Sequence, residues 1–294
     1  MARGQLLLVI YRTGPLLQKH LNHMWSFLND AFIDEEKAVL HCTDLSIQRG
    51  YAVFDFFKVV DSVPVFLDDH LDRFYYSARE TRLEVGYPKD QMKRIILELL
   101  DKNNSGDTGV RITATGGYSV DGYQLAKPNL LISLRPFSIP TAEQLSKGIT
   151  LMSYEHQRQL PHVKTIDYLM AIWLQPLVKQ SGADDILYHQ ERMVSECPRS
   201  NFFIVTAEKK IITPAFNVLK GVIRKKLIEV ARQEFEVEER DLSIEEIKTA
   251  NEAFITSTTK IILPVRQIDE HTFEAPNKIA LHLRNQLLHL QAVE

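Results

Sequence analysis

Short segments with the composition of β-strands alternate with helical segments along the whole chain, without a low-complexity linker or a detectable repeat. This alternation is typical of an α/β fold. Residues 51–60 and 63–67 lie close enough to form a hairpin, and helices are predicted over residues 68–85 and from Pro88 onward. We therefore expect an α/β protein with mixed sheets packed against helices.

The length of 294 residues exceeds the usual size of one hydrophobic core, which favours two domains. The first residues lack acidic side chains, and they contain an apolar run that is too short to span a membrane. We therefore expect an extension ahead of the fold. A polar segment that contains Pro140 separates the two halves. The expected division is an extension over 1–23, a small α/β domain over 24–137, a linker over 138–147 and a larger domain over 148–294.

Composition places the chain among ordinary globular proteins. It has 45% hydrophobic residues, 25% charged residues and a formal net charge of -3, so nothing indicates a nucleic acid or membrane partner. Cys42 and Cys197 cannot build a disulfide framework, which favours a cytoplasmic location. The ten histidines show no spacing that favours a metal site.

Two residues carry candidate chemistry. Lys164 follows a turn with a proline and comes directly before an apolar-periodic segment, and Glu196 stands at the end of a predicted strand. A lysine that can form an imine and an acid that can keep a pyridine nitrogen protonated are the groups that a pyridoxal phosphate enzyme requires. Alone, each residue is as compatible with an ordinary surface lysine and an ordinary strand end.

The chain also contains groups suited to binding a phosphate. A glycine precedes a predicted helix at residues 221–223, hydroxyl side chains follow one another at residues 257–259, and Arg73 lies on an earlier helix. Backbone N–H groups at a helix start, a hydroxyl and an arginine together match the oxygens of a phosphate. Each of these features is common by itself.

Five segments, in order along the chain, carry a resemblance to a known family: HLDRF at 70–74, VKTIDYL at 163–169, SECPRSNFF at 195–203, KGVIR at 220–224 and TSTTKIILPVRQID at 256–269. With them the chain resembles the class IV aminotransferases. These pyridoxal phosphate enzymes of fold type IV include branched-chain aminotransferases, D-amino acid aminotransferases and aminodeoxychorismate lyase. The resemblance runs from about residue 24 to the C-terminus.

The resemblance implies a role for individual residues. Lys164 becomes the Schiff-base lysine, Glu196 the partner of the pyridine nitrogen and Arg73 a phosphate ligand. Three further groups are implied to bind the phosphate: the backbone amides of Val222 and Ile223 and the hydroxyl of Thr258. Thr259 is implied to contact the substrate. The resemblance also implies the two-domain architecture of D-amino acid aminotransferases, pyridoxal 5'-phosphate bound in the larger domain, and a homodimer with its active site between the domains.

Other positions bear on which member of the family the chain resembles most. Tyr168 stands where branched-chain enzymes have a tyrosine that contacts the phenolic oxygen of the cofactor. D-specific enzymes carry an arginine and a histidine where this chain has Asp121 and Tyr123, which argues against D-specificity. We expect Phe56 and Tyr123 to line an apolar side-chain pocket and Arg111 to bind a substrate carboxylate.

The sequence departs from the family pattern at several positions. Ile223 replaces a frequent threonine, Asp167 a usual asparagine, and Lys260 and Ile261 a small residue and a glutamate. Arg199 is an unusual cation beside the cofactor loop, which we expect to point into solvent.

Three functions follow as hypotheses. The first is an aminotransferase with ping-pong kinetics that acts on a branched-chain or similarly apolar L-amino acid and a 2-oxo acid. The second is a lyase that eliminates pyruvate from aminodeoxychorismate. The third is a cofactor-binding protein without turnover, which the altered positions 223 and 260 would explain.

Overall fold

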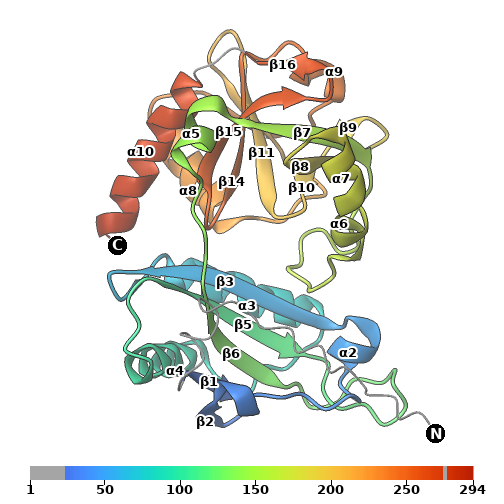
Figure 1. The fold of residues 1–294 in the computed structure, drawn as a ribbon, viewed down its shortest axis with the longest axis vertical. Helices are drawn as coiled ribbons and strands as arrows, with labels where there is room; N and C mark the ends of the chain where they lie inside the picture. Colours follow the sequence, from blue (N-terminus) through green and yellow to red (C-terminus); the bar gives the residue numbers. More distant parts are fainter. Residues whose placement is uncertain (1–23, 274–276, 294) are drawn as a thin grey trace, which may run out of the picture.

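The structure of the protein is a computed structural model that describes residues 24–273 and 277–293. Its strands form two sheets, one in each half of the chain, with helices packed around them (Figure 1). The predicted extension over residues 1–23 lies outside the described residues. The α/β class is confirmed.

The first sheet has six antiparallel strands in the order β2-β1-β6-β5-β3-β4. The predicted hairpin is present, but its second strand is shorter than expected, because helix α3 already begins at Leu67. The elements of this half are β1 (Trp25–Leu28), β2 (Ala31–Asp34), the 3-10 helix η1 (Glu35–Lys37), α2 (Leu45–Arg49), β3 (Ala52–Val60), β4 (Val63–Pro64), α3 (Leu67–Glu80), α4 (Lys89–Lys102), β5 (Thr108–Thr115) and β6 (Leu130–Arg135).

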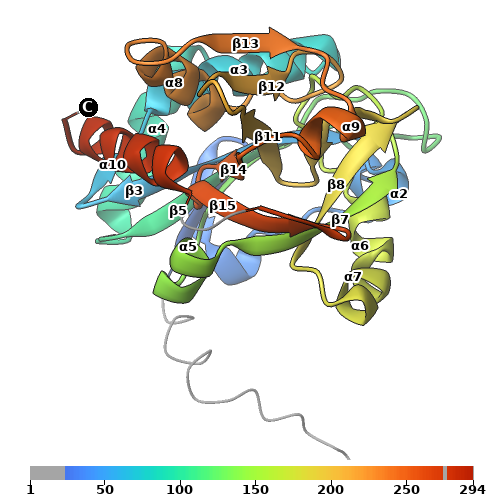
Figure 2. The same ribbon diagram turned by 90° about the horizontal axis from the view of Figure 1, so that it is seen from above.

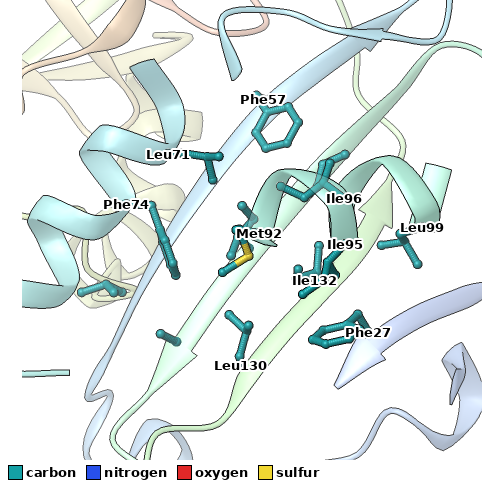
Figure 3. Close-up of a cluster of buried hydrophobic side chains, with 14 of the residues drawn as sticks. Phe27, Phe57, Leu71, Phe74, Met92, Ile95, Ile96, Leu99, Leu130 and Ile132 are labelled. Atoms are coloured by element: carbon teal, nitrogen blue, oxygen red, sulfur yellow. The ribbon is translucent and has the colours of Figure 1, made fainter. Parts of the chain in front are cut away.

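Helices α3 and α4 cover one face of this sheet. Met92, Ile96 and Leu99 recur at helical spacing in α4, and all three are fully buried. In Figure 3 they meet Phe27 and Ile132 from the sheet and Leu71 and Phe74 from α3. This apolar cluster fixes β3 against the helix that carries Arg73.

The second sheet is mixed, with the order β13-β12-β11-β14-β15-β7-β8-β9. Helices α8 and α10 pack on one face of its centre, against β14 and β15. The elements are β7 (Ile149–Glu155), β8 (Asp185–Gln190), β9 (Met193–Val194), β10 (Glu196–Cys197), β11 (Ser200–Val205), β12 (Ile211–Pro214), α8 (Val222–Ala231), β13 (Val237–Arg240), α9 (Ile244–Ile247), β14 (Glu252–Ser257), β15 (Ile261–Ile268), β16 (His271–Thr272) and α10 (Lys278–Val293).

The segment between the sheets contains a short helix, α5 (Ala142–Lys147). It begins with a capping box, in which Thr141 accepts a hydrogen bond from the amide of Gln144 and the Gln144 side chain accepts one from the Thr141 amide. The domain division stays a prediction. The two halves pack on each other where α3 meets α8 (Figure 2), and Val65 and Phe66, just before α3, share an apolar cluster with residues of α8.

The segment around Lys164 differs from its prediction. Instead of preceding a helix directly, it is extended beside β3, where the Phe54 amide donates to the Lys164 carbonyl at 2.9 Å and the Ile166 amide to the Ala52 carbonyl at 3.1 Å. Helix α6 (Leu169–Trp173) begins only afterwards, followed by α7 (Gln175–Ser181). The apolar side chains of α6 are mostly exposed rather than buried.

Across the described residues, none of the helices has both the length and the apolar character needed to cross a bilayer.

Replacing Leu99 with alanine should lower the free energy of unfolding by about 2–5 kcal/mol, because it leaves a cavity under the first sheet. Leu97 is the matched control, since it lies on the same helix with 50% of its surface exposed, and Leu97→Ala should change the free energy by less than about 1 kcal/mol. Urea unfolding of both variants measures the difference. Equal losses would contradict this account of the core.

Candidate functional site

A cavity of about 530 Å³ lies between the two halves of the chain and is lined by residues of both sheets. It gathers the candidate residues of the sequence analysis with one exception, Tyr123. Those that line it are Phe56, Arg73, Arg111, Lys164, Tyr168, Glu196, Val222, Ile223, Thr258 and Thr259. No cluster of three metal-ligating side chains occurs among the residues that the structure describes.

Lys164, a half-buried residue, presents its amine to this cavity. Its Nζ lies 4.6 Å from the centroid of the Phe54 ring, and its backbone is fixed by β3 and by a 3.2 Å bond from its amide to the Ser77 hydroxyl. Within the described chain no carboxylate forms an ion pair with this amine. Burial, with the nearby charge of Arg73, lowers the pKa of Lys164 to about 7, so the amine is substantially neutral near neutral pH.

Asp55 lies close enough to Lys164 to favour the charged amine, but this acid is already engaged elsewhere. Asp55, fully buried on β3, receives two hydrogen bonds of 2.8 Å from Arg73 and lies 2.7 Å from His70 Nδ1. Burial alone would raise the pKa of Asp55, but Arg73 and His70 lower it well below its usual range. Asp55 therefore fixes the orientation of Arg73 at the cavity and leaves the amine of Lys164 without a counter-ion.

Glu196 is the one acidic side chain, among the described residues, that lines the cavity. Its carboxylate accepts hydrogen bonds from Arg158 Nε at 2.9 Å, the Leu219 amide at 2.9 Å and Asn201 Nδ2 at 3.2 Å. Burial raises the pKa of Glu196, whereas Arg158 and the Leu219 amide favour the charged form. A fixed negative charge of this kind can hold a cationic ring nitrogen.

The start of α8 offers a cradle for an anion. The amides of Val222 and Ile223 form no hydrogen bond within the described part of the chain, as expected for the first turn of a helix. A Cβ at Gly221 would lie 2.1 Å from Asn201 Oδ1, so only glycine fits there. The buried hydroxyl of Thr256 also lacks a partner among the described residues. These orphaned donors, with Arg73, Lys164 and Glu196, fit a pyridine ring that carries an aldehyde and a phosphate.

The side chain of Ile223 lies in the apolar cluster beneath the cavity, so this residue offers only its backbone amide. Thr258 and Thr259 line the cavity from the turn between β14 and β15. They stay predicted contacts of phosphate and substrate.

Aromatic and cationic groups line the side of the cavity that is formed by β3, β5 and the segment after Lys164. The Arg111 guanidinium lies 3.9 Å from the Phe54 ring centroid, and Phe56 faces Arg111 across the strand pair β3 and β5. Tyr168 lies 6.1 Å from Phe54, measured between ring centroids, and burial raises the pKa of its phenol. The phenol thus stays protonated and can donate a hydrogen bond into the cavity.

Tyr123 lies outside the cavity of this chain, with 84% of its surface exposed. Asp121, two residues earlier, accepts hydrogen bonds from Ser119 and from the amides of Tyr123 and Gln124. Its carboxylate therefore has a structural role within its own loop. Arg199 is exposed but lines the cavity, whereas the sequence analysis expected it to point into solvent.

Sequence reasoning missed several residues of the site, two that line the cavity and one, Asp55, that supports Arg73. Phe54 could have been found, because it lies two residues before Phe56 and alternate strand residues share a face. Asp55 was also detectable as a single acid within an apolar strand, where a charge requires a partner. No pattern in the sequence indicates that Arg158 would reach Glu196.

Comparison with known proteins gives a consistent family. A family model described as "Amino-transferase class IV" matches residues 52–268. A putative branched-chain-amino-acid aminotransferase of Methanocaldococcus jannaschii is 30% identical over 251 residues, which cover 83% of this chain and 87% of that protein. A D-alanine aminotransferase of Bacillus licheniformis is 23% identical over 267 residues, covering 88% of this chain and 94% of that protein.

Solved structures share the fold. A branched-chain amino acid aminotransferase from Escherichia coli superposes with a TM-score of 0.82 at 22% identity, covering 92% of this chain and 94% of that one. A putative 4-amino-4-deoxychorismate lyase from Legionella pneumophila subsp. pneumophila str. Philadelphia 1 has a TM-score of 0.80 at 25% identity, covering 87% of this chain and 97% of the other. Another branched-chain amino acid aminotransferase of this fold was solved with pyridoxamine 5'-phosphate.

In the protein without cofactor, Lys164 should react with a small amine-specific reagent with a midpoint near pH 7, because burial lowers its pKa to about 7. An unperturbed lysine has a pKa of about 10.4. Below the midpoint the amine is charged and unreactive, and above it the labelling rate reaches a plateau. Competitive labelling followed by peptide mass spectrometry measures this, and a midpoint near that of the surface lysines would show that the amine is solvated.

Proposed function

The chain belongs to the class IV aminotransferases, and we propose that it moves an amino group from an L-amino acid to a 2-oxo acid with pyridoxal 5'-phosphate as its cofactor. The observation that carries this proposal is the cavity that Lys164 and Glu196 share, which joins a half-buried amine without a counter-ion to a buried carboxylate. When bound, the cofactor supplies an electron sink for the substrate α-carbon.

The proposed roles follow from the position of each group. Lys164 would hold the cofactor covalently. Once displaced by the substrate, its amine would carry a proton from the substrate α-carbon to the cofactor carbon in one half-reaction, and in the reverse direction in the other. Glu196 supplies the negative charge that keeps the ring nitrogen protonated, and Tyr168 donates to the phenolic oxygen. Arg73, Thr258 and the amides of Val222 and Ile223 hold the phosphate.

Substrate contacts are proposed for residues on both sides of the cavity, from β3 and β5 and from the turn between β14 and β15. Arg111 and Thr259 bind the substrate carboxylate, and Phe56 lines the apolar side-chain region together with Phe54. This lining and the similarity to a putative branched-chain enzyme support a branched-chain or similarly apolar substrate. The absence of an arginine and a histidine at positions 121 and 123 supports the L-configuration over the D-configuration of the D-alanine relatives. Tyr123 takes part only if its loop reaches the site of a second chain.

A lyase is the second candidate, which the fold similarity to a putative 4-amino-4-deoxychorismate lyase favours. Such an enzyme would release pyruvate without an amino acceptor, using the same lysine. A cofactor-binding protein without turnover is the third candidate, supported by the missing hydroxyl at Ile223.

We further propose a homodimer in the cytoplasm. Leu169, Ile172 and Trp173 of α6 expose 77%, 69% and 66% of their surface, and neighbouring apolar side chains on one short helix favour an interface. Cys42 and Cys197 are both unpaired, which supports a reducing compartment.

Replacing Lys164 with alanine should reduce transamination by at least about 100-fold, because the proton carrier is lost. Lys248 is the control, since it is exposed and lies away from the cavity, and Lys248→Ala should keep the wild-type rate. Formation of L-glutamate from 2-oxoglutarate and a panel of amino donors measures the rate. Wild-type turnover by Lys164→Ala would refute the proposal, and pyruvate release without an acceptor would favour the lyase.

Replacing Trp173 with glutamate should shift the protein from dimer to monomer, because a charge cannot be buried without a partner in an apolar interface. Leu288→Glu is the control, an exposed apolar residue on α10, which lies on the other side of the molecule in Figures 1 and 2. Sedimentation equilibrium distinguishes the states. A monomeric wild type, or a dimeric Trp173→Glu, would contradict the interface.

A further inference from the structure

A second cavity, of about 420 Å³, lies at the end of the second sheet farthest from the first sheet, where Figure 1 shows β9, β16 and α9. Within the described chain it shares no lining residue with the cavity that contains Lys164, the first cavity. Helix α9 forms one side. The other side is a single face of the sheet, because the strand residues that line it are directly paired: Ser153 with Leu187, His189 with Val194, and Ile268 with His271.

The floor of the second cavity is apolar. Leu187 and Val194 of the sheet and Ile247 of α9 are buried in one apolar cluster with Ile268. A water molecule against this floor lacks the polar partners that hold buried water in place. Displacing such water with an apolar group is favourable. The second cavity is therefore suited to the apolar part of a small molecule.

Two histidines beside this floor have unused hydrogen-bonding capacity. His189 and His271 both line the second cavity, and neither ring forms a hydrogen bond within the described part of the chain. One nitrogen of each ring, His189 Nδ1 and His271 Nε2, is buried without a partner. The His271 ring also packs edge-on against Phe273, with the ring centroids 4.8 Å apart. Since an unpaired buried polar atom costs free energy, both rings call for a partner that the described residues do not supply.

Charged side chains at the second cavity balance one another. Its described lining contains two basic residues, Arg192 and Lys248, and two acidic residues, Asp269 and Glu270, and all four are exposed. Arg192 already pairs with Glu245, with 2.7 Å between its Nε and the carboxylate Oε1. The lining thus has no excess of charge that would select an anion or a cation, which favours an uncharged ligand.

The second cavity also lies beside the segment that leads to Glu196. Val194 lines the second cavity and Glu196 lines the first. Ser195, between them, is fixed to the Tyr188 carbonyl by its amide at 2.9 Å and by its hydroxyl at 3.2 Å. A molecule in the second cavity would therefore pack against the segment that carries the acid of the first.

We propose that the second cavity binds an uncharged, largely apolar molecule that carries a hydroxyl group. The apolar part lies on the floor, and the hydroxyl lies at His189 and His271. A hydroxyl suits both rings because it can donate to an imidazole nitrogen or accept from one, whichever tautomer each ring has. This site goes beyond the proposed amino transfer and does not depend on it.

The binding test compares p-cresol with toluene, which lacks only the hydroxyl. Ligand-observed NMR titrations use the protein loaded with pyridoxal 5'-phosphate, so that the cofactor occupies the first cavity. The wild type should bind p-cresol about 5-fold more tightly than toluene, the gain expected from one hydrogen bond. His189→Phe and His271→Phe keep a flat ring without nitrogens, so each should reduce this preference and leave the affinity for toluene unchanged. His41→Phe is the control, an exposed histidine outside both linings, and should retain the preference.

Replacing Ile244 with tryptophan tests the location. Ile244 of α9 is half-buried and lines the second cavity, so a larger side chain should fill the space and abolish binding of both ligands. Circular dichroism checks the fold, and if Ile244→Trp does not fold, the histidine variants decide. Unchanged affinity for p-cresol in a folded Ile244→Trp, an unchanged preference in both histidine variants, or a wild type that binds neither ligand would overturn the site. None of these outcomes bears on amino transfer, which the panel of amino donors measures separately.

Discussion

The site depends on the burial of an amine that has no acid beside it. A lysine removed from water loses hydration energy, and without a carboxylate partner its neutral form is favoured. The structure achieves this at Lys164 by engaging the neighbouring acids elsewhere. Asp55 is bound by Arg73 and His70, and Glu196 by Arg158, so each carboxylate orients another group instead of neutralising the amine.

The position of that amine depends in turn on both halves of the chain. The Lys164 segment adds to the edge of β3 through backbone hydrogen bonds, while its continuation returns to the second sheet at β8. On the other wall, Asn201 connects Glu196 to the Leu219 carbonyl and occupies the space that a side chain at residue 221 would need. The side chain of Asn201 therefore helps to position both the Glu196 carboxylate and the start of α8.

Much of this arrangement was predictable from residue chemistry. Strand and helix patterns located β3, β4 and α8, because their apolar periodicity is strong and Gly221 precedes the helix. Lys164 and Glu196 were identifiable through the order of the five segments that resemble the family, since each residue alone is as compatible with a surface lysine or an ordinary strand end. The exposed face of α6 was not predicted, since an apolar helical pattern does not reveal whether it faces a core or another surface. The ion pair of Arg158 with Glu196 depends on tertiary packing between segments that no sequence period connects.

The most direct test of the central claim is the site of covalent attachment. The protein is incubated with pyridoxal 5'-phosphate, reduced with borohydride, digested and mapped by mass spectrometry. If the buried amine is the attachment point, the pyridoxyl group is found on Lys164 and is absent from Lys260, the other lysine of the described cavity lining. Modification of Lys260 or of scattered surface lysines, with Lys164 unmodified, would contradict the account.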